Sequence, residues 1–234
     1  MRTFCPYGEP FYVGEEAFTA NETIEILAPL LTAHRRDRIA YAVSNRTYWV
    51  VPVMEGLYDR GNVSAVLRTA EGLGYQAVHI IELSKKFKQA RQVTQGAEKW
   101  LDITRWDATE ACVDHLKSLG YRILVACLDN ARPIEAYAFD QPTALCFGNE
   151  RDGLTPELLA RADARVVVPM LGLSQSYNIS VAAALALYHI YRDRCARLGR
   201  HGDLSQTETR ILTAEFYRRS VANADKVLLE TRKG

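Results

Sequence analysis

The sequence predicts an α/β protein with a mostly parallel sheet, helices on both faces of the sheet, and helical extensions at both ends. Short apolar runs rich in β-branched residues alternate with helical segments, which is the pattern of βαβ units. The 234 residues, 48% of them hydrophobic, suffice to bury such a core. No apolar run approaches the ~20 residues of a membrane span, and no secretory signal is evident. We therefore expect a cytoplasmic protein.

The first part of the chain contains three of the predicted strands. Residues 1–18 lack a clear period and are expected to form an extended arm, and Thr19 with Glu22 has the pattern of a capping box. The elements expected next are a helix at 29–45, a strand at 48–54, a helix at 62–73, a strand at 77–83, a polar loop at 84–100, a helix at 107–119 and a strand at 122–127.

The second part carries loops that are typical of a ligand site. A buried strand at 143–147 stops at Gly148-Asn149-Glu150, at the sheet edge where open α/β sheets bind ligands. Gly172 and a run of polar residues precede a long helix, which Ser176 or Asn178 is expected to cap. The remaining elements expected here are a helix at 156–162 after Thr155, a strand at 164–168, the long helix at 179–198 and a final helix, broken or whole, at 205–229.

Other motifs narrow the class of protein. Neither a GxGxxG fingerprint nor a P-loop occurs, so an ordinary dinucleotide or nucleotide site is not expected. The five cysteines are scattered without a CxxC pair, which argues against a disulfide framework and a zinc site; no metal is expected. The net charge is only +1, but arginines cluster at both ends of the chain. They belong either to solvated helix faces or to a rim that binds a polyanion.

Three ordered motifs carry a family resemblance. They are NVSAVLRTA from Asn62, FGNERDGL from Phe147, and VPMLG from Val168 followed by SYNISVA from Ser176. Together they resemble the SPOUT superfamily of RNA methyltransferases, specifically the TrmH family, over roughly residues 32–220. The resemblance implies an S-adenosylmethionine-dependent ribose 2′-O-methyltransferase that works as a homodimer. It also implies a deep trefoil knot in the C-terminal half, which local sequence patterns do not predict.

The resemblance also implies roles for individual residues. Arg68 is expected to engage an RNA phosphate and assist deprotonation of the 2′-hydroxyl; because arginine is a poor base, we favour activation that the phosphate assists. Helix capping or purely structural bonding stays open for Asn62, Glu150, Ser176 and Asn178. The implied catalytic residues are Asn62, Arg68, Glu150, Ser176 and Asn178. The implied cofactor-binding residues are Leu145, Phe147, Gly148, Asn149, Val168, Met170, Gly172, Ser176 and Asn178, of which the glycines allow close approach of the chain.

The expected substrate is tRNA. Residues 95–100, QGAEKW, resemble a signature of the tRNA-modifying branch, whose substrate is the D-loop guanosine at position 18. Members that modify ribosomal RNA tend to carry a separate N-terminal substrate domain, for which the residues before Asn62 are too few. Tyr177 departs from the family, where a small aliphatic residue is common. The alternatives are a ribosomal RNA 2′-O-methyltransferase and an inactive RNA-binding homologue. We expect an N-terminal extension (1–46), a methyltransferase domain (47–199) and a C-terminal extension (200–234).

Overall fold

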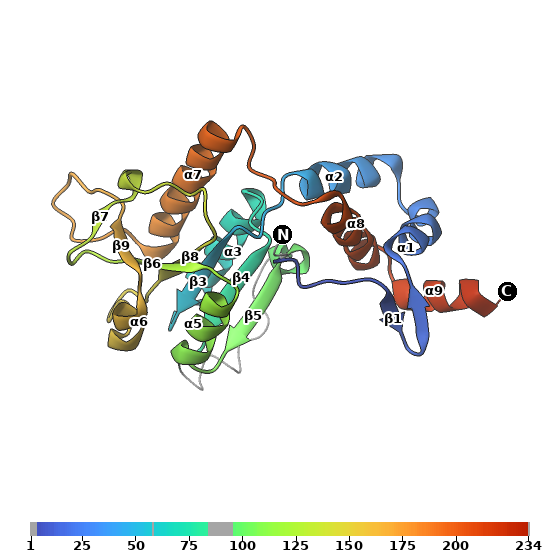
Figure 1. Cartoon of the computed structure of the whole chain (residues 1–234), viewed down its shortest axis with the longest axis horizontal. Coiled ribbons are helices and arrows are strands. Elements are labelled where there is room, and N and C mark those ends of the chain that lie inside the picture. Colours follow the sequence, from blue (N-terminus) through green and yellow to red (C-terminus); the bar gives the residue numbers. More distant parts are fainter. Residues whose placement is uncertain (1–3, 58, 84–95, 234) are drawn as a thin grey trace. The chain divides into compact units, whose positions relative to one another are not determined.

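The computed structural model describes residues 4–57, 59–83 and 96–233 (Figure 1). The chain forms two compact units. Unit 1 comprises Met1–Thr47 and Gly202–Gly234, so that both terminal segments belong to one body, and unit 2 comprises Tyr48–His201. In the described part of the chain, no helix is long and apolar enough to cross a membrane.

Unit 2 is built on a parallel sheet, which confirms the predicted fold class at this level. The seven strands lie in the order β5-β4-β3-β8-β6-β9-β7, and every neighbouring pair is parallel. The strands are β3 (Val50–Glu55), β4 (Ala77–Ile81), β5 (Asp102–Trp106), β6 (Arg122–Ala126), β7 (Arg132–Pro133), β8 (Thr143–Phe147) and β9 (Ala164–Val167). The helices are α3 (Arg60–Gly72), α5 (Thr109–Ser118), α6 (Pro156–Arg161) and α7 (Ile179–Leu198), with short 3₁₀ helices η2 (Ala97–Trp100) and η3 (Ile134–Ala136).

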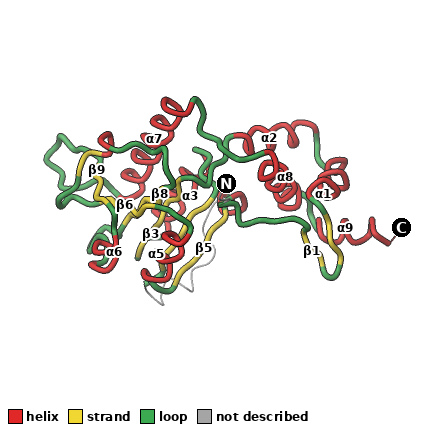
Figure 2. The backbone as a smooth tube through the Cα atoms, viewed as in Figure 1, coloured by secondary structure: helices red, strands yellow, loops and turns green. Residues whose placement is uncertain are grey.

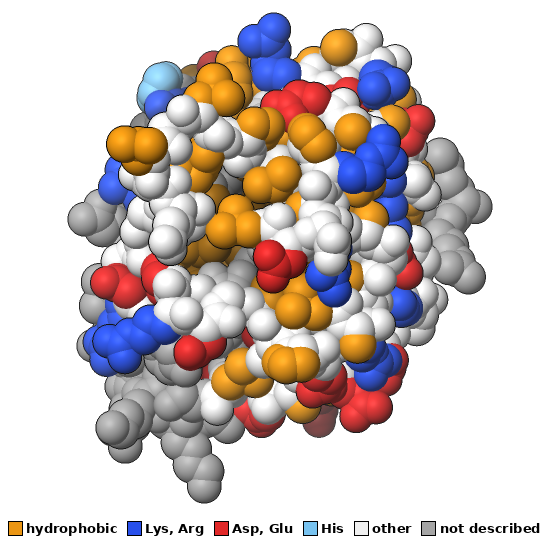
Figure 3. Space-filling model, turned by 90° about the vertical axis from the view of Figure 1, so that its left-hand side faces the viewer, with side chains coloured by type: hydrophobic (Ala, Val, Ile, Leu, Met, Phe, Trp, Pro, Cys, Tyr) orange, Lys and Arg blue, Asp and Glu red, His pale blue; other side chains and the backbone are white. Residues whose placement is uncertain are grey.

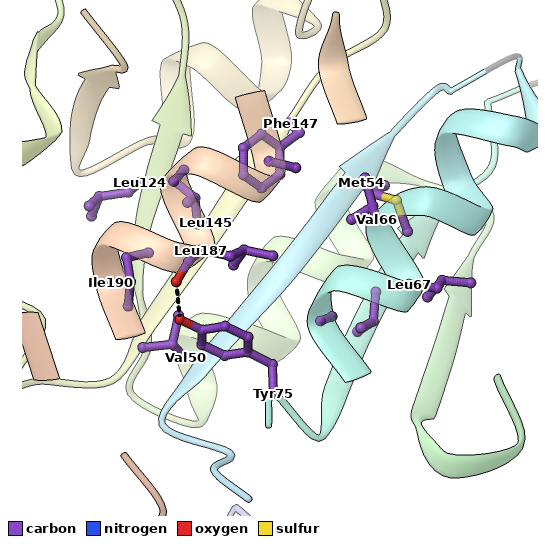
Figure 4. Packing of buried hydrophobic residues seen from close by; sticks show 14 of the residues in the cluster. Val50, Met54, Val66, Leu67, Tyr75, Leu124, Leu145, Phe147, Leu187 and Ile190 are labelled. Atoms are coloured by element: carbon purple, nitrogen blue, oxygen red, sulfur yellow. Dashed lines mark hydrogen bonds between the residues drawn. The ribbon is translucent and has the colours of Figure 1, made fainter. Parts of the chain in front are cut away.

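Helices cover both faces of this sheet. α3 packs against α7 on one face, and α5 packs against α6 on the other (Figure 1). The central strands β3 and β8 are buried along their whole length, which is why they appear in the sequence as continuous apolar runs. Figure 4 shows the core between this sheet and the helices α3 and α7, where the hydroxyl of Tyr75 donates to the carbonyl of Leu187 at 2.6 Å.

The strand register brings the functional loops together. Phe147 of β8 pairs with Met54 of β3 on one side and with Ala126 of β6 on the other, and Ala126 in turn pairs with Val166 of β9. All these residues lie at the carboxyl ends of their strands. The loops that follow β6, β8 and β9 therefore leave the sheet at the same edge.

Unit 1 is a helical body with a small hairpin (Figure 2). Its elements are β1 (Phe11–Val13), β2 (Glu16–Phe18), α1 (Ala20–Leu27), η1 (Ala28–Leu30), α2 (Ala33–Ser44), α8 (Gln206–Ser220) and α9 (Ala224–Lys233). α8 packs against α1 and α2, and α9 packs against α1. The predicted capping box of Thr19 and Glu22 is confirmed, and Ser205 with Glu208 forms a second one at the start of α8.

Several elements differ from the expectation. The extended arm contains the antiparallel hairpin β1–β2. The helix expected at 29–45 is divided, because the hydroxyl of Thr32 accepts from the amide of Arg35 and starts α2 anew. The final helix is broken into α8 and α9 at 221–223, where Asn223 has φ 55°. Strand β5 was not expected. It lies at the sheet edge and has no fully buried position, so its sequence contains no continuous apolar run that would predict a strand. Most of the expected loop at 84–100 lies outside the described residues.

Candidate active site

A cavity of about 520 Å³ lies at the carboxyl edge of the sheet in unit 2. The loops after β6, β8 and β9 and the first turns of α7 form its walls. Figure 3 views the side of the molecule that carries β7 and β9, and hydrophobic side chains surround hollows on this surface. The cavity has the size of a small-molecule site and the position expected for a ligand in an open α/β sheet.

The lining of the cavity combines apolar walls with a few polar groups. Buried side chains of Ile134, Phe147, Leu154, Val166 and Ala186 supply the apolar surface. The polar side chains that line it are Asp129, Asn149, Glu150, Asp152, Arg165, Ser176, Tyr177 and Asn178. Such a mixture suits a ligand with one flat apolar part and one charged or hydroxylated part. Among the described residues, no group of three or more His, Cys, Asp or Glu is placed to hold a metal ion.

The loop after β8 is closed on itself by its own backbone. Asn149 and Gly153 exchange two backbone hydrogen bonds of 3.1 Å, and Oδ1 of Asn149 accepts from the amides of Arg151 and Asp152 at 2.9 and 2.7 Å. A Cβ on Gly148 would overlap the carbonyl group of Gly153 and lie 2.5 Å from the amide nitrogen of Leu154. Gly148 is therefore needed for the fold of the loop itself, whereas the family resemblance implied that this glycine allows the close approach of a ligand.

Asn62 joins this loop to α3. Helix α3 is capped by Asp59, whose Oδ1 accepts from the amides of Gly61 and Asn62 at 2.6 and 3.2 Å. The capping role left open for Asn62 thus falls to Asp59, and the amide side chain of Asn62 is available to the site. Its Nδ2 donates to Oε1 of Glu150.

Asn178 completes a chain of three polar side chains. Its Nδ2 donates to Oδ1 of Asn62 at 3.3 Å. Its own Oδ1 accepts from the amide of Ser180 at 2.9 Å, so Asn178 rather than Ser176 caps α7. Asn178, Asn62 and Glu150 thereby connect the start of α7, the first turn of α3 and the loop after β8. Asn62 lies more than 80 positions from each partner in the sequence and does not itself line the cavity, but it joins two residues that do.

Three of the expected site residues lie outside both the cavity lining and this hydrogen-bonded chain. Leu145 is fully buried within β8, in the hydrophobic core. Arg68 lies on the exposed side of α3, about one and two-thirds turns beyond Asn62, and is not among the residues that line the cavity. Gly172 also lies outside the lining, and a Cβ placed on it would meet nothing within 4 Å. The other expected residues of the cofactor site line the cavity; they are Phe147, Gly148, Asn149, Val168, Met170, Ser176 and Asn178.

The loop after β6 was missed as part of the site. Cys127, Leu128 and Asp129 line the cavity, and Nη1 of Arg165 donates to the backbone carbonyl of Asp129 at 3.3 Å. Burial raises the pKa of the Cys127 thiol, so this group stays protonated at neutral pH. A signal was present, because these residues follow the predicted strand at 122–127 and leave the sheet at the ligand-binding edge.

Comparisons with known proteins agree with this architecture. Residues 50–188 match the SpoU rRNA Methylase family. A tRNA (guanosine(18)-2′-O)-methyltransferase of Borreliella burgdorferi is 33% identical over 201 residues, which cover 86% of this chain and 92% of the relative. A protein of the same name from Escherichia coli K12 is 34% identical over 68% of this chain and 70% of its own. The crystal structure of the A. aeolicus TrmH/SpoU tRNA modifying enzyme superposes with a TM-score of 0.73 at 26% identity, over 81% of this chain and 98% of that one.

Fold and cavity together define an α/β enzyme with its ligand site at the carboxyl edge of a parallel sheet. The matches to the family and to its relatives cover most of the chain. The chain belongs to the SpoU family of RNA 2′-O-methyltransferases, in its TrmH branch. This confirms the family and the class of enzyme that the three motifs predicted.

Proposed function

We propose that this protein methylates the ribose 2′-oxygen of guanosine 18 in the D-loop of tRNA, with S-adenosylmethionine as methyl donor. The observation that carries the proposal is the hydrogen-bonded chain of Asn178, Asn62 and Glu150 beside the cavity, formed by residues from all three family motifs. The names of the relatives from B. burgdorferi and E. coli support guanosine 18 as the target. We place this activity in the cytoplasm.

The residues of the cavity fit the proposed methyl donor. Its buried apolar walls, which include Phe147 and Ile134, suit the adenine ring. The carboxylates of Asp129, Glu150 and Asp152 line the same space and suit a ligand that carries an ammonium and a sulfonium group. When bound, S-adenosylmethionine supplies an electrophilic methyl group. The backbone around Gly148, Val168 and Met170 supplies the fixed polar groups that hold such a ligand in one orientation.

The polar residues of the site hold one another and the RNA in a fixed orientation. Asn62 holds Glu150 and is itself held by Asn178, and Ser176 stands two residues before Asn178 in the cavity wall. We assign Arg68 to an RNA phosphate, because guanidinium groups remain protonated at neutral pH and bind phosphate bidentately. Its position outside the cavity fits contact with the RNA rather than with the methyl donor.

We also propose that the protein works as a homodimer with a trefoil knot. Val181, Leu185 and Tyr188 are exposed apolar residues spaced four and three apart on α7, so they form one stripe on that helix. Leu171 and Leu173, which precede α7, are fully exposed. A stripe of this kind is typical of a helix that packs against a second copy. The knot rests on the family resemblance, and light scattering on the purified protein tests the dimer.

Methylation of defined transcripts tests the function. Unmodified tRNA and ribosomal RNA are incubated with the protein and with S-adenosylmethionine labelled in its methyl group, and the modified nucleotide is mapped. We expect label in tRNA at guanosine 18, and none in a transcript in which adenosine replaces this guanosine. Label in ribosomal RNA alone would establish the first alternative. Calorimetric binding of tRNA without transfer to either RNA would establish an inactive RNA-binding homologue.

The variant Arg68→Ala tests the role of the exposed arginine in the same assay. We expect at least a hundredfold loss of methyl transfer, because a charge-assisted phosphate contact and the activation of the hydroxyl are both removed, roughly 3 kcal/mol. Binding of S-adenosylmethionine, measured by calorimetry, should be retained. An Arg68→Ala protein of normal activity would contradict the assignment.

A further inference from the structure

Glu55 is a buried carboxylate at the carboxyl end of β3. Glu55 is only 1% exposed and does not line the cavity. A buried charge costs free energy unless hydrogen bonds compensate for the lost water. Three donors do so here. The hydroxyls of Thr109 and Thr155 donate to Oε1 at 2.6 and 2.8 Å, and the amide of Thr155 donates to Oε2 at 2.8 Å.

Thr155 connects this carboxylate to the candidate active site. It is the first residue after the loop 148–154, of which every residue except Arg151 lines the cavity, Glu150 included. Its hydroxyl also accepts from the amide of Leu158 at 3.2 Å and so caps α6. The start of the loop is fixed by strand β8 and by the contact between Gly148 and Gly153. The end of the loop is fixed by two hydrogen bonds from Thr155 to Glu55.

The charge on Glu55 has a physical consequence for the loop. Hydrogen bonds to a charged acceptor contribute more to stability than hydrogen bonds between neutral groups. Both oxygens of the carboxylate are used on Thr155, so the threonine is held through its backbone and its side chain together. An apolar residue at this position would leave the amide of Thr155 without its acceptor.

We infer that Glu55 is a positioning residue for the active-site loop, because its carboxylate fixes Thr155 and thereby the place of Glu150 beside the cavity. The inference rests on the proposed function in one respect, namely that this loop binds the methyl donor. The contact of Glu55 with Thr109 provides an internal control, because Thr109 lies at the start of α5 and does not belong to the loop.

Two isosteric variants separate positioning from stability. Thr155→Val and Thr109→Val each remove one hydroxyl donor from the same carboxylate oxygen. We expect both to lower the melting temperature. Only Thr155→Val should weaken calorimetric binding of S-adenosylmethionine and lower kcat, each by about tenfold, the ratio that corresponds to one hydrogen bond to a charged group. The conservative variant Thr155→Ser keeps the hydroxyl, so its binding of S-adenosylmethionine and its kcat should stay close to those of the unaltered protein.

A third variant removes the confounding loss of the helix cap. Glu55→Gln leaves the hydroxyl of Thr155 free to cap α6 but replaces the carboxylate by an amide. We expect it to reproduce the tenfold weaker binding. Hydrogen exchange of the amides of residues 149–155, measured without any ligand, should be faster in Glu55→Gln and in Thr155→Val than in Thr109→Val.

The outcomes distinguish this inference from the function on which it rests. If Thr155→Val and Glu55→Gln bind S-adenosylmethionine as tightly as the unaltered protein while their melting temperatures fall, the carboxylate only stabilises the fold and the inference is wrong. If the unaltered protein itself neither binds S-adenosylmethionine nor methylates RNA, the proposed function fails. Unchanged hydrogen exchange in that case would overturn the positioning role as well.

Discussion

The side chain of Asn62 can take part in the site because Asp59, and not Asn62, caps helix α3. Asp59 satisfies the first amides of α3, so the side chain of Asn62 bonds to Glu150 on one side and to Asn178 on the other. An amide is suited to this position because it can donate to a carboxylate and accept from a second amide at once. A carboxylate of similar size has no hydrogen to donate, and a hydroxyl has a single polar atom where the amide has two.

The variant Asn62→Asp tests this arrangement. It places a second negative charge beside Glu150, and like charges at hydrogen-bond distance repel. We expect Asn62→Asp to lower kcat for tRNA methylation more than Asn62→Ala does, by about a further tenfold. A side-by-side measurement of kcat at neutral pH decides the order. If the aspartate variant were the more active one, the amide would not be needed to donate to Glu150.

Gly148→Ala tests the closed loop after β8. The added methyl group would overlap the backbone of Gly153 and Leu154, which cannot move aside as a flexible side chain can. We expect a loss of stability of about 2–3 kcal/mol in urea unfolding, and loss of calorimetric S-adenosylmethionine binding. Gly72→Ala is the matched control, because a Cβ on Gly72 meets nothing within 4 Å. Equal stability of the two variants would disprove the crowding.

Site residues could be predicted from the sequence only where they belong to one of the family motifs. The cluster of Asn62, Glu150 and Asn178 followed from the family resemblance, and the structure brings these three side chains together. Glu55 could not be foreseen, because a glutamate at the end of an apolar strand gives no sign of the two threonines that meet it, 54 and 100 residues further along the chain. Long-range pairing of this kind is decided by the fold and leaves no local pattern.

At the scale of elements, the arginines of unit 1 mainly hold its segments together. Arg210 pairs with Glu9 at 3.0 Å, and Arg232 pairs with Glu22 at 2.8 Å, so that α8 and α9 are tied to the N-terminal segment. Arg219 donates to the hydroxyl of Tyr7 at 2.5 Å. The sequence left open whether such arginines form a rim that binds a polyanion. For these three residues that role is not needed to explain the charge, because their guanidinium groups bind side chains within unit 1. Charge clustering in a sequence does not tell the two uses apart.

Helix α2 offers a direct comparison of the two uses. Nη1 of Arg36 donates to the carbonyls of Ala28 and Leu31, both at 2.9 Å, whereas Arg38 is exposed on the helix. We expect Arg36→Ala to cost about 1–2 kcal/mol in urea unfolding followed by circular dichroism, with little change in KM for tRNA. Arg38→Ala should leave stability unchanged and raise KM severalfold, more so at low salt. The reverse pattern would show that Arg38 does not contact the RNA.

Elements were predictable where burial left a continuous pattern. The expected strand at 143–147 and the expected helix at 179–198 coincide with β8 and α7, because the first is fully buried and the second has a clear cap and a glycine at its end. β5 and the hairpin β1–β2 escaped because edge and two-stranded elements bury few side chains. The break between α8 and α9 was left open by the sequence and depends on the left-handed backbone of Asn223.

At the scale of the whole molecule, unit 2 carries a built-in sensitivity to acid. His79 of β4 is buried, and burial, with a smaller contribution from His115, lowers its pKa to about 4. Its Nδ1 accepts from Nε1 of Trp106 at 2.9 Å, so the neutral ring is the one that fits. In the unfolded chain the ring takes up a proton near pH 6.5. The stabilising contribution of the neutral ring is therefore complete above pH 6.5 and is lost as the pH falls toward 4.

The variant His79→Gln measures this contribution. Between pH 7.5 and pH 5 we expect the unaltered protein to lose about 2 kcal/mol more stability than the variant, because only the unaltered unfolded chain gains a proton at position 79 in this range. The three tryptophans, Trp49, Trp100 and Trp106, all belong to unit 2, so urea unfolding followed by tryptophan fluorescence reports on this unit alone. Parallel pH profiles for the two proteins would contradict the buried neutral ring.

The composition of unit 1 from both terminal segments has a consequence for synthesis. Residues 1–47 are translated before unit 2, whereas α8 and α9, which cover Phe11 and Ala20, are translated after it. Unit 2 lies entirely between them and can complete its sheet while the ribosome is still at work. The apolar face of the N-terminal segment therefore stays uncovered until α8 and α9 have been synthesised. A chain that ended near residue 202 would contain all of unit 2, and the uncovered apolar face of residues 1–47 would be open to proteases.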